Sequence, residues 1–255
     1  KPAGHACGHN LFGTASAAAA MAAAEWLKQT GRGGTIRFYG TPAEEGGSGK
    51  VYMVRAGLFD DVDAVLQWHA GDRNAASPGS NLAVKSAMFR FAGVSAHAAA
   101  SPDRGRSALD GIEAMNYMAN LMREHVPQQT RIHYVITDGG SAPNVVPDHA
   151  EVYYYVRHPE AETVRSIFDR LVKAAEGAAA GTGTTVEYEV VGGAYERLPV
   201  VALQELVYAN LNAVGGVTYD APEQEFAEAL KKTLPAEPAL GSERQIQPFE
   251  WEQGY

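Results

Sequence analysis

The pattern of hydrophobic and polar positions predicts a first region that mixes helices with short buried strands. Residues 11–27 are rich in alanine, which is typical of a tightly packed helix, and glycines from Gly31 onward end it. Apolar runs at residues 35–39 and 62–69 predict buried strands, and residues 50–56 predict a short helix between them. Strand, helix and strand joined by short links favour a parallel α/β sheet.

The pattern changes near residue 83 and predicts a second group of elements. Four segments alternate with the period of a strand: residues 84–94, 131–137, 150–156 and 184–191. Two segments have the apolar period of a helix: residues 103–124 and 161–179. The resulting order, β-α-β-β-α-β, is typical of a ferredoxin-like domain.

The predicted fold class is therefore α/β, with one domain inserted into another. We expect residues 1–83 to form the first part of an αβα domain and residues 84–192 to form the inserted ferredoxin-like domain. Residues 193–255 would return to the first domain through a helix at residues 200–213. The polar tail from residue 235 onward shows no pattern that predicts an element.

Composition narrows the function. The chain has 255 residues, of which 45% are hydrophobic and 20% charged, as in soluble globular proteins. Its net charge of −9 argues against nucleic acid or an acidic membrane surface as a partner. The single cysteine, Cys7, excludes an intrachain disulfide and indicates a reducing compartment, so we expect a cytoplasmic location. The alanine-rich stretch is too weakly apolar to cross a bilayer.

Chemically useful residues gather at three points of the first region. Cys7 and His9 flank Gly8, which permits a tight turn just before the alanine-rich helix, where the helix N-terminus favours a thiolate. Glu44 and Glu45 follow the first predicted strand, and His69 ends the second. Because sites in open α/β sheets lie beyond the carboxyl ends of strands, we expect these residues to converge.

Thiolate, imidazole and carboxylate together are ligands for a transition metal such as Zn²⁺, and an oxygen-rich site of this kind also accepts Mn²⁺. The adjacent glutamates fit a division of labour, in which one binds the metal and the other accepts a proton from water. Taken singly, Cys7 reads as a small buried hydrophobe, His9 as a cap residue and the glutamates as a solvated pair. A rival hypothesis makes Cys7 a thiol nucleophile with a histidine as its base, but it leaves the paired glutamates unexplained.

The inserted domain carries three further candidates. His97 ends the segment Gly93–His97, Asn144 lies in the turn-rich loop at residues 139–147, and Arg157 follows a predicted strand. Histidine, asparagine and arginine can polarise a carbonyl and bind a carboxylate. Individually, each is more simply read as a surface or turn residue.

Together these motifs resemble the M20 family of metallopeptidases, in its amidohydrolase branch with a Cys-Gly-His motif. The resemblance covers nearly the whole chain, and the segment Asn10-Leu-Phe-Gly13 is most similar to the p-aminobenzoyl-glutamate hydrolase group. The matching segments are Gly4–Asn10, Pro42–Glu45, Trp68–His69, Gly93–His97, Gly139–Pro147 and Arg157.

The resemblance implies a centre of two divalent ions, Mn²⁺ or Zn²⁺. It implies that Cys7 takes the place of a bridging carboxylate and that His9 and His69 bind one ion. By the same resemblance, Glu45 binds the other ion and Glu44 is the general base.

The resemblance also implies roles for the inserted domain, as a lid and as the dimerisation domain of a homodimer. His97 would reach into the partner subunit's site to bind substrate or stabilise the oxyanion. Asn144 and Arg157 would hold the substrate carboxylate.

The expected function is hydrolysis of the amide bond in N-acyl or N-aroyl amino acids or small peptides. Family members have sheet strands before the Cys-Gly-His motif and a last metal-binding histidine near the C-terminus, whereas no histidine follows His158 here. We therefore expect both ends of the catalytic domain to be missing from this chain. One alternative is an inactive or non-enzymatic binding module, and another is a dipeptidase or aminopeptidase specificity.

Overall fold

The computed structural model describes residues 5, 7–76, 78–236 and 238–250, so Gly4 and Ala6 of the first motif lie outside the described residues. The chain forms two compact units. Unit 1 holds the described residues up to 41, residues 59–79 and those from 199 onward, and unit 2 holds residues 42–58 and 80–198. The predicted boundaries at residues 83 and 192 stay a prediction, and the segment at 42–58 groups with unit 2.

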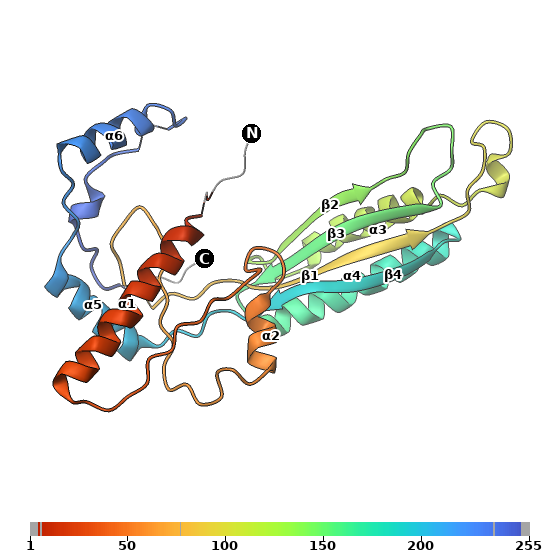
Figure 1. Ribbon diagram of the computed structural model, residues 1–255. Coiled ribbons are helices and arrows are strands. Elements are labelled where there is room, and N and C mark those ends of the chain that lie inside the picture. Colours follow the sequence, from red (N-terminus) through yellow and green to blue (C-terminus); the bar gives the residue numbers. More distant parts are fainter. Residues whose placement is uncertain (1–4, 6, 77, 237, 251–255) are drawn as a thin grey trace. The chain divides into compact units, whose positions relative to one another are not determined.

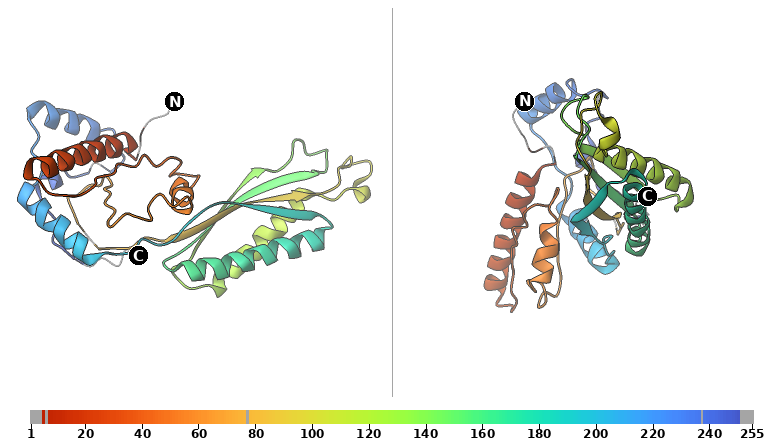
Figure 2. Two further views of the ribbon diagram at one scale, coloured as in Figure 1. Left: turned by 60° about the horizontal axis from the view of Figure 1, so that its bottom comes forward. Right: turned by 90° about the vertical axis from the view of Figure 1, so that its right-hand side faces the viewer.

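Unit 2 is built on a four-stranded antiparallel sheet in the order β2-β3-β1-β4. Helices α3 and α4 lie along one face of this sheet (Figures 1 and 2). The order of elements confirms the predicted β-α-β-β-α-β pattern. The elements are β1 (Ala83–Ala92), α3 (Ala108–Met122), β2 (Arg131–Asp138), β3 (His149–His158), α4 (Ala161–Thr182) and β4 (Thr185–Ala194).

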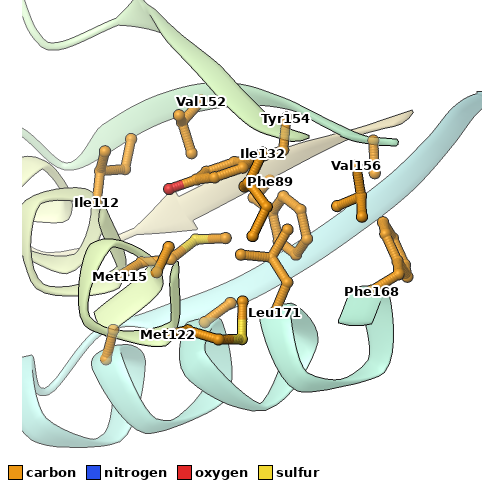
Figure 3. Packing of buried hydrophobic residues seen from close by; sticks show 14 of the residues in the cluster. Phe89, Ile112, Met115, Met122, Ile132, Val152, Tyr154, Val156, Phe168 and Leu171 are labelled. Atoms are coloured by element: carbon orange, nitrogen blue, oxygen red, sulfur yellow. The ribbon is translucent and has the colours of Figure 1, made fainter. Parts of the chain in front are cut away.

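The core of unit 2 lies between the sheet and the two helices. In β1 and β3, buried side chains alternate with more exposed ones, and in α4 the buried residues lie three and four positions apart. The strand period and the helix period thus turn the apolar side chains of all three elements into this layer. Figure 3 shows Phe89, Tyr154, Phe168 and Leu171 packed there, each at most 1% exposed. The buried hydroxyl of Tyr154 donates to Asn116 of α3, which satisfies both polar groups.

Unit 1 is helical in the described residues, with α1 (His9–Thr30), α5 (Val201–Val214) and α6 (Ala221–Lys231). A seven-residue helix, α2 (Gly49–Arg55), belongs to unit 2. Helix α6 was not predicted, although Asp220 and Glu223 form a capping box at its start that marks the helix in the sequence.

Two sequence expectations for unit 1 are wrong. Residues 35–39 and 62–69 form no strand, and α1 buries none of its residues. A strand of a parallel sheet exists only through hydrogen bonds to neighbouring strands. Within the part of unit 1 that the structure describes, the one such pairing is an isolated bridge between Asn74 and Ile246, so no sheet layer covers the alanine-rich helix.

An exposed ion pair joins two residues of this region. The Arg37 guanidinium donates to both carboxylate oxygens of Asp61, and this pairing lowers the pKa of Asp61. Both side chains are exposed, so the pair contributes little to stability. No helix in the described residues is long and apolar enough to cross a membrane.

Replacing Phe89 with alanine should destabilise unit 2 by about 3–5 kcal/mol, because it leaves a cavity in the core. Chemical denaturation followed by near-ultraviolet circular dichroism measures this loss. Tyr117→Ala on the outer side of α3, where Tyr117 is 67% exposed, is the matched control and should change stability by less than about 0.5 kcal/mol. Equal effects of the two substitutions would contradict the assignment of Phe89 to the core.

Candidate functional site

Cys7 and His69 meet in unit 1, although 62 positions separate them in the chain. The Cys7 Sγ lies 3.1 Å from His69 Nε2. Gly8 adopts a left-handed backbone (φ 91°) and ends the turn, so that α1 begins at His9 and Cys7 stands at the helix N-terminus as predicted.

A second contact sets the orientation of the His69 ring. Its Nδ1 lies 2.8 Å from the carbonyl oxygen of Ala70, so Nδ1 carries the hydrogen and donates it. Nε2 then presents its lone pair toward Cys7. Metal-binding histidines are held in this way, with one ring nitrogen bound to a carbonyl and the other available as a ligand.

The aromatic ring of Phe12 lies beside this pair. Its centroid is 5.2 Å from His9, 4.8 Å from His69 and 5.2 Å from Trp68. Phe12 follows His9 by three positions on α1, so the two side chains share one helix face. Sequence reasoning missed Phe12, and this helical spacing was the signal that could have found it.

Glu44 and Glu45 lie in a tight turn of unit 2 and are exposed. The backbone N–H of Gly47 donates to the carbonyl of Ala43 at 2.9 Å and closes the turn. Ala43 and Ser48, on either side of the glutamates, both have left-handed backbones (φ 54° and 51°). Such conformations are costly for residues other than glycine and cluster at functional sites.

His97 and Asn144 come together at one end of the unit 2 sheet. Their loops meet in an antiparallel bridge between His97 and Val145, and the N–H of Ala98 donates to the carbonyl of Asn144 at 3.0 Å. His97 Nδ1 accepts two backbone N–H groups, from Ala99 at 3.2 Å and Ala100 at 3.1 Å. The neutral ring must therefore carry its hydrogen on Nε2, which makes Nε2 a donor.

Arg157 lies at the opposite end of the same sheet. His149, at the start of β3, pairs with Ala92, whereas Arg157 is eight residues further along that strand, about 27 Å away at the usual rise. The Arg157 guanidinium stacks over Tyr155 at 5.3 Å, and Arg157 stands directly opposite Arg131 of β2. A hydrogen bond to Tyr153 raises the pKa of Tyr155.

The candidates thus come from both units of the chain. Cys7, His9 and His69 belong to unit 1, while Glu44 and Glu45 belong to unit 2. In unit 2 the structure brings His97 beside Asn144 and does not bring either beside Arg157. Within one chain the length of β3 separates Asn144 from Arg157, and their expected role in holding the substrate carboxylate stays a prediction.

Comparison with known proteins identifies the domain. Residues 81–183 match the family model described as the peptidase dimerisation domain of M20 proteins. The chain is 48% identical over 232 residues to one of the p-aminobenzoyl-glutamate hydrolase subunits of Escherichia coli K12, covering 91% of this chain and 48% of that protein. It is 33% identical over 188 residues to a Xaa-Arg dipeptidase of Mus musculus, covering 73% of this chain and 43% of that protein.

A solved structure supports the same relationship. The crystal structure of an aminobenzoyl-glutamate utilization protein from Klebsiella pneumoniae superposes with a TM-score of 0.52 at 25% identity, covering 65% of this chain and 44% of that one. The chain spans about half the length of the curated relatives it matches.

These findings assign residues 81–183 to the M20 dimerisation domain and confirm the resemblance to the M20 family that the motifs indicated. Within the family, the chain is similar to p-aminobenzoyl-glutamate hydrolases.

The ring nitrogens of His97 provide a direct test of the geometry. Nitrogen-15 NMR at a pH where the ring is neutral should show the Nε2–H tautomer, because Nδ1 accepts the two backbone N–H groups. His133, on the sheet, provides a comparison resonance. A signal from the Nδ1–H tautomer of His97 would contradict the described loop.

Proposed function

We propose that this protein is a metal-dependent amidohydrolase that cleaves the amide bond of N-acyl or N-aroyl amino acids resembling p-aminobenzoyl-glutamate. The contact between Cys7 and His69 carries the proposal, because the His69 tautomer leaves Nε2 available as a ligand beside a thiol. The names of the relatives add support, since several are hydrolases of amide bonds in acylated amino acids or dipeptides.

The donor set fits a divalent ion. Within unit 1, Cys7 offers a thiol, and His9 and His69 each offer an imidazole. By the family resemblance, Glu45 adds a carboxylate. Thiolate and imidazole suit Zn²⁺, and the carboxylate also suits Mn²⁺. When bound, the ions would supply Lewis acidity toward the amide carbonyl and toward water. We propose two ions, as the family resemblance implies.

Glu44 is the proposed general base. It accepts a proton from the attacking water and passes that proton to the nitrogen of the leaving amine, which balances the hydrolysis. Arg157 binds the free carboxylate of the substrate through its planar guanidinium. The Nε2–H of His97 stabilises the negative charge that develops on the carbonyl oxygen.

The separation of His97 from Arg157 supports a homodimer with shared sites. The two residues lie at opposite ends of one sheet, so a single copy does not present both to one small substrate. We propose that His97 and Asn144 serve the site of the partner subunit, while Arg157 and Glu44 serve their own. Dimerisation through unit 2 agrees with the family of residues 81–183.

The Cys7–His69 pair also favours a second candidate, a thiol nucleophile activated by a histidine base. The two candidates differ in their inhibitors. A chelator should abolish hydrolysis by the metal enzyme. A thiol enzyme should keep its activity in the chelator and lose it to iodoacetamide. A panel of acylated amino acids and dipeptides separates amidohydrolase from dipeptidase specificity, and the absence of turnover on all of them would favour an inactive binding module.

Glu44→Gln in the full-length protein should lower kcat for amide hydrolysis by about 10²–10⁴-fold, because the base is lost. The bound metal, measured by elemental analysis, should stay unchanged. Glu45→Gln is the matched control one position away and should lower the metal content instead. Substantial turnover by the Glu44→Gln variant would exclude Glu44 as the base.

Mixing two inactive variants should restore activity if the sites are shared. His97→Ala lacks a residue given to the partner's site, and Glu44→Gln lacks one of its own site, so a mixed dimer has one intact site. Random reassociation should recover about a quarter of wild-type activity, since half of the dimers are mixed and half of their sites work.

The control mixture combines His97→Ala with Asn144→Ala. Both variants lack a residue that serves the partner's site, so no site in a mixed dimer is intact and activity should stay at the level of the single variants. Recovery in this control would show that His97 and Asn144 serve different sites. No recovery in the first mixture would place His97 in the site of its own chain.

A further inference from the structure

Ser48 occupies the N-cap position of α2 but does not cap the helix. A serine at this position ordinarily accepts a hydrogen bond from a backbone N–H of the first turn, and Ser48 makes no such bond. Its Oγ instead accepts the backbone N–H of Gly193 in β4, at 3.2 Å. The hydroxyl therefore joins the end of the Glu44–Glu45 turn to the sheet of unit 2.

Gly192 of β4 leaves the space that the Ser48 hydroxyl occupies. A Cβ added at Gly192 would lie 2.7 Å from Ser48 Oγ and 3.3 Å from Ser86 Oγ, so any side chain there would displace Ser48. The backbone of Gly192 lies outside the left-handed region, and its importance is therefore the space that it leaves. The Ser86 hydroxyl donates to the carbonyl of Gly192 at 3.4 Å and completes the contact.

The same region of the sheet carries Arg157. Gly193 stands opposite Lys85 of β1, and Lys85 stands opposite Val156 of β3, the residue before Arg157. Two strand spacings therefore separate Gly193 from Val156, a distance of about 10 Å. Figure 1 shows α2 beside the end of the sheet where β1 begins and β4 ends.

A row of hydroxyl groups runs from Ser86, which donates to the Gly192 carbonyl, toward Arg157. The Tyr153 hydroxyl lies 3.5 Å from Ser86 Oγ and 3.2 Å from the Tyr155 hydroxyl, and Arg157 stacks on Tyr155. The turn at the other end has two left-handed residues, Ala43 and Ser48, which persist only when neighbouring structure holds them.

We propose that Ser48 is a positioning residue that fixes the Glu44–Glu45 turn to β4, at a set distance from Arg157. This inference rests on the proposed function, in which Arg157 binds the substrate carboxylate and Glu44 transfers the proton. The hydrogen bond between Ser48 and Gly193 then holds Glu44 at the distance from Arg157 that a substrate needs. With its carboxylate bound to Arg157, the substrate presents its amide bond to Glu44. Its loss lowers kcat and leaves KM nearly unchanged, because Arg157 keeps its own contacts.

The test uses Ser48→Gly and Gly192→Ala in the full-length protein. Glycine adopts a φ of 51° readily, so Ser48→Gly removes the hydroxyl without adding strain. It should lower kcat by about 10–100-fold, the scale expected for a displacement near 1 Å. Metal content should stay unchanged. Gly192→Ala should cause a similar loss by displacing Ser48, and the double variant should be no worse than Ser48→Gly alone.

Two further variants separate positioning from general stability. Ser48→Asn should restore much of kcat, because asparagine tolerates the left-handed backbone and offers an acceptor oxygen to Gly193. Ser80→Ala is the matched control: its hydroxyl also bonds the backbone of unit 2, donating to the Arg197 carbonyl, but Ser80 is not part of the turn. It should leave kcat unchanged. Full kcat in Ser48→Gly, or multiplied losses in the double variant, would overturn the proposal.

Amide hydrogen exchange at Gly193 gives a readout that needs no activity. Exchange should accelerate in Ser48→Gly and return toward the wild-type rate in Ser48→Asn, because the accepting oxygen is removed and then replaced. Unchanged exchange in Ser48→Gly refutes the contact whatever the activity. Accelerated exchange in a protein whose wild type hydrolyses no amide would refute the proposed function and leave the contact between turn and sheet established.

Discussion

The pairing of β1 with both β3 and β4 is the interaction on which the rest of unit 2 depends. β1 is an inner strand, and its inward residues Phe89 and Phe91 are fully buried beneath α3 and α4. Because each residue of an antiparallel ladder has one partner on either side, this register also decides where outward side chains stand. It places Arg157 near Gly193, and it separates Arg157 from the loops that carry His97 and Asn144.

Local patterns predicted the inserted domain well, because its elements are encoded by neighbouring residues. The alternation in β1 and the apolar period of α4 can be read without knowing what packs against them. Unit 1 was predicted less well for the opposite reason. The apolar runs at residues 35–39 and 62–69 need partner strands to become strands, and the described part of this chain provides none.

The candidate site shows the same division between local and distant information. The turn at Gly8 and the helix that follows it were predicted. Cys7 and His69 also lie together, although the described residues do not form the sheet that was expected to bring them together. Residue types alone could not predict the His69 and His97 tautomers, the stacking of Phe12 or the contact of Ser48 with Gly193. Each depends on a backbone group or ring supplied by the fold, such as the Ala70 carbonyl or the Gly193 N–H.

The position of Arg157 opposite Arg131 has an energetic consequence. Like charges directly across an antiparallel pair oppose folding, and here the two guanidinium groups turn toward different neighbours, Arg157 toward Tyr155 and Arg131 toward the carbonyls of Gln128 and Thr130. An anion at Arg157 would neutralise part of this repulsion. Occupancy and folding are then thermodynamically linked, so that a carboxylate ligand stabilises the very strands that hold it.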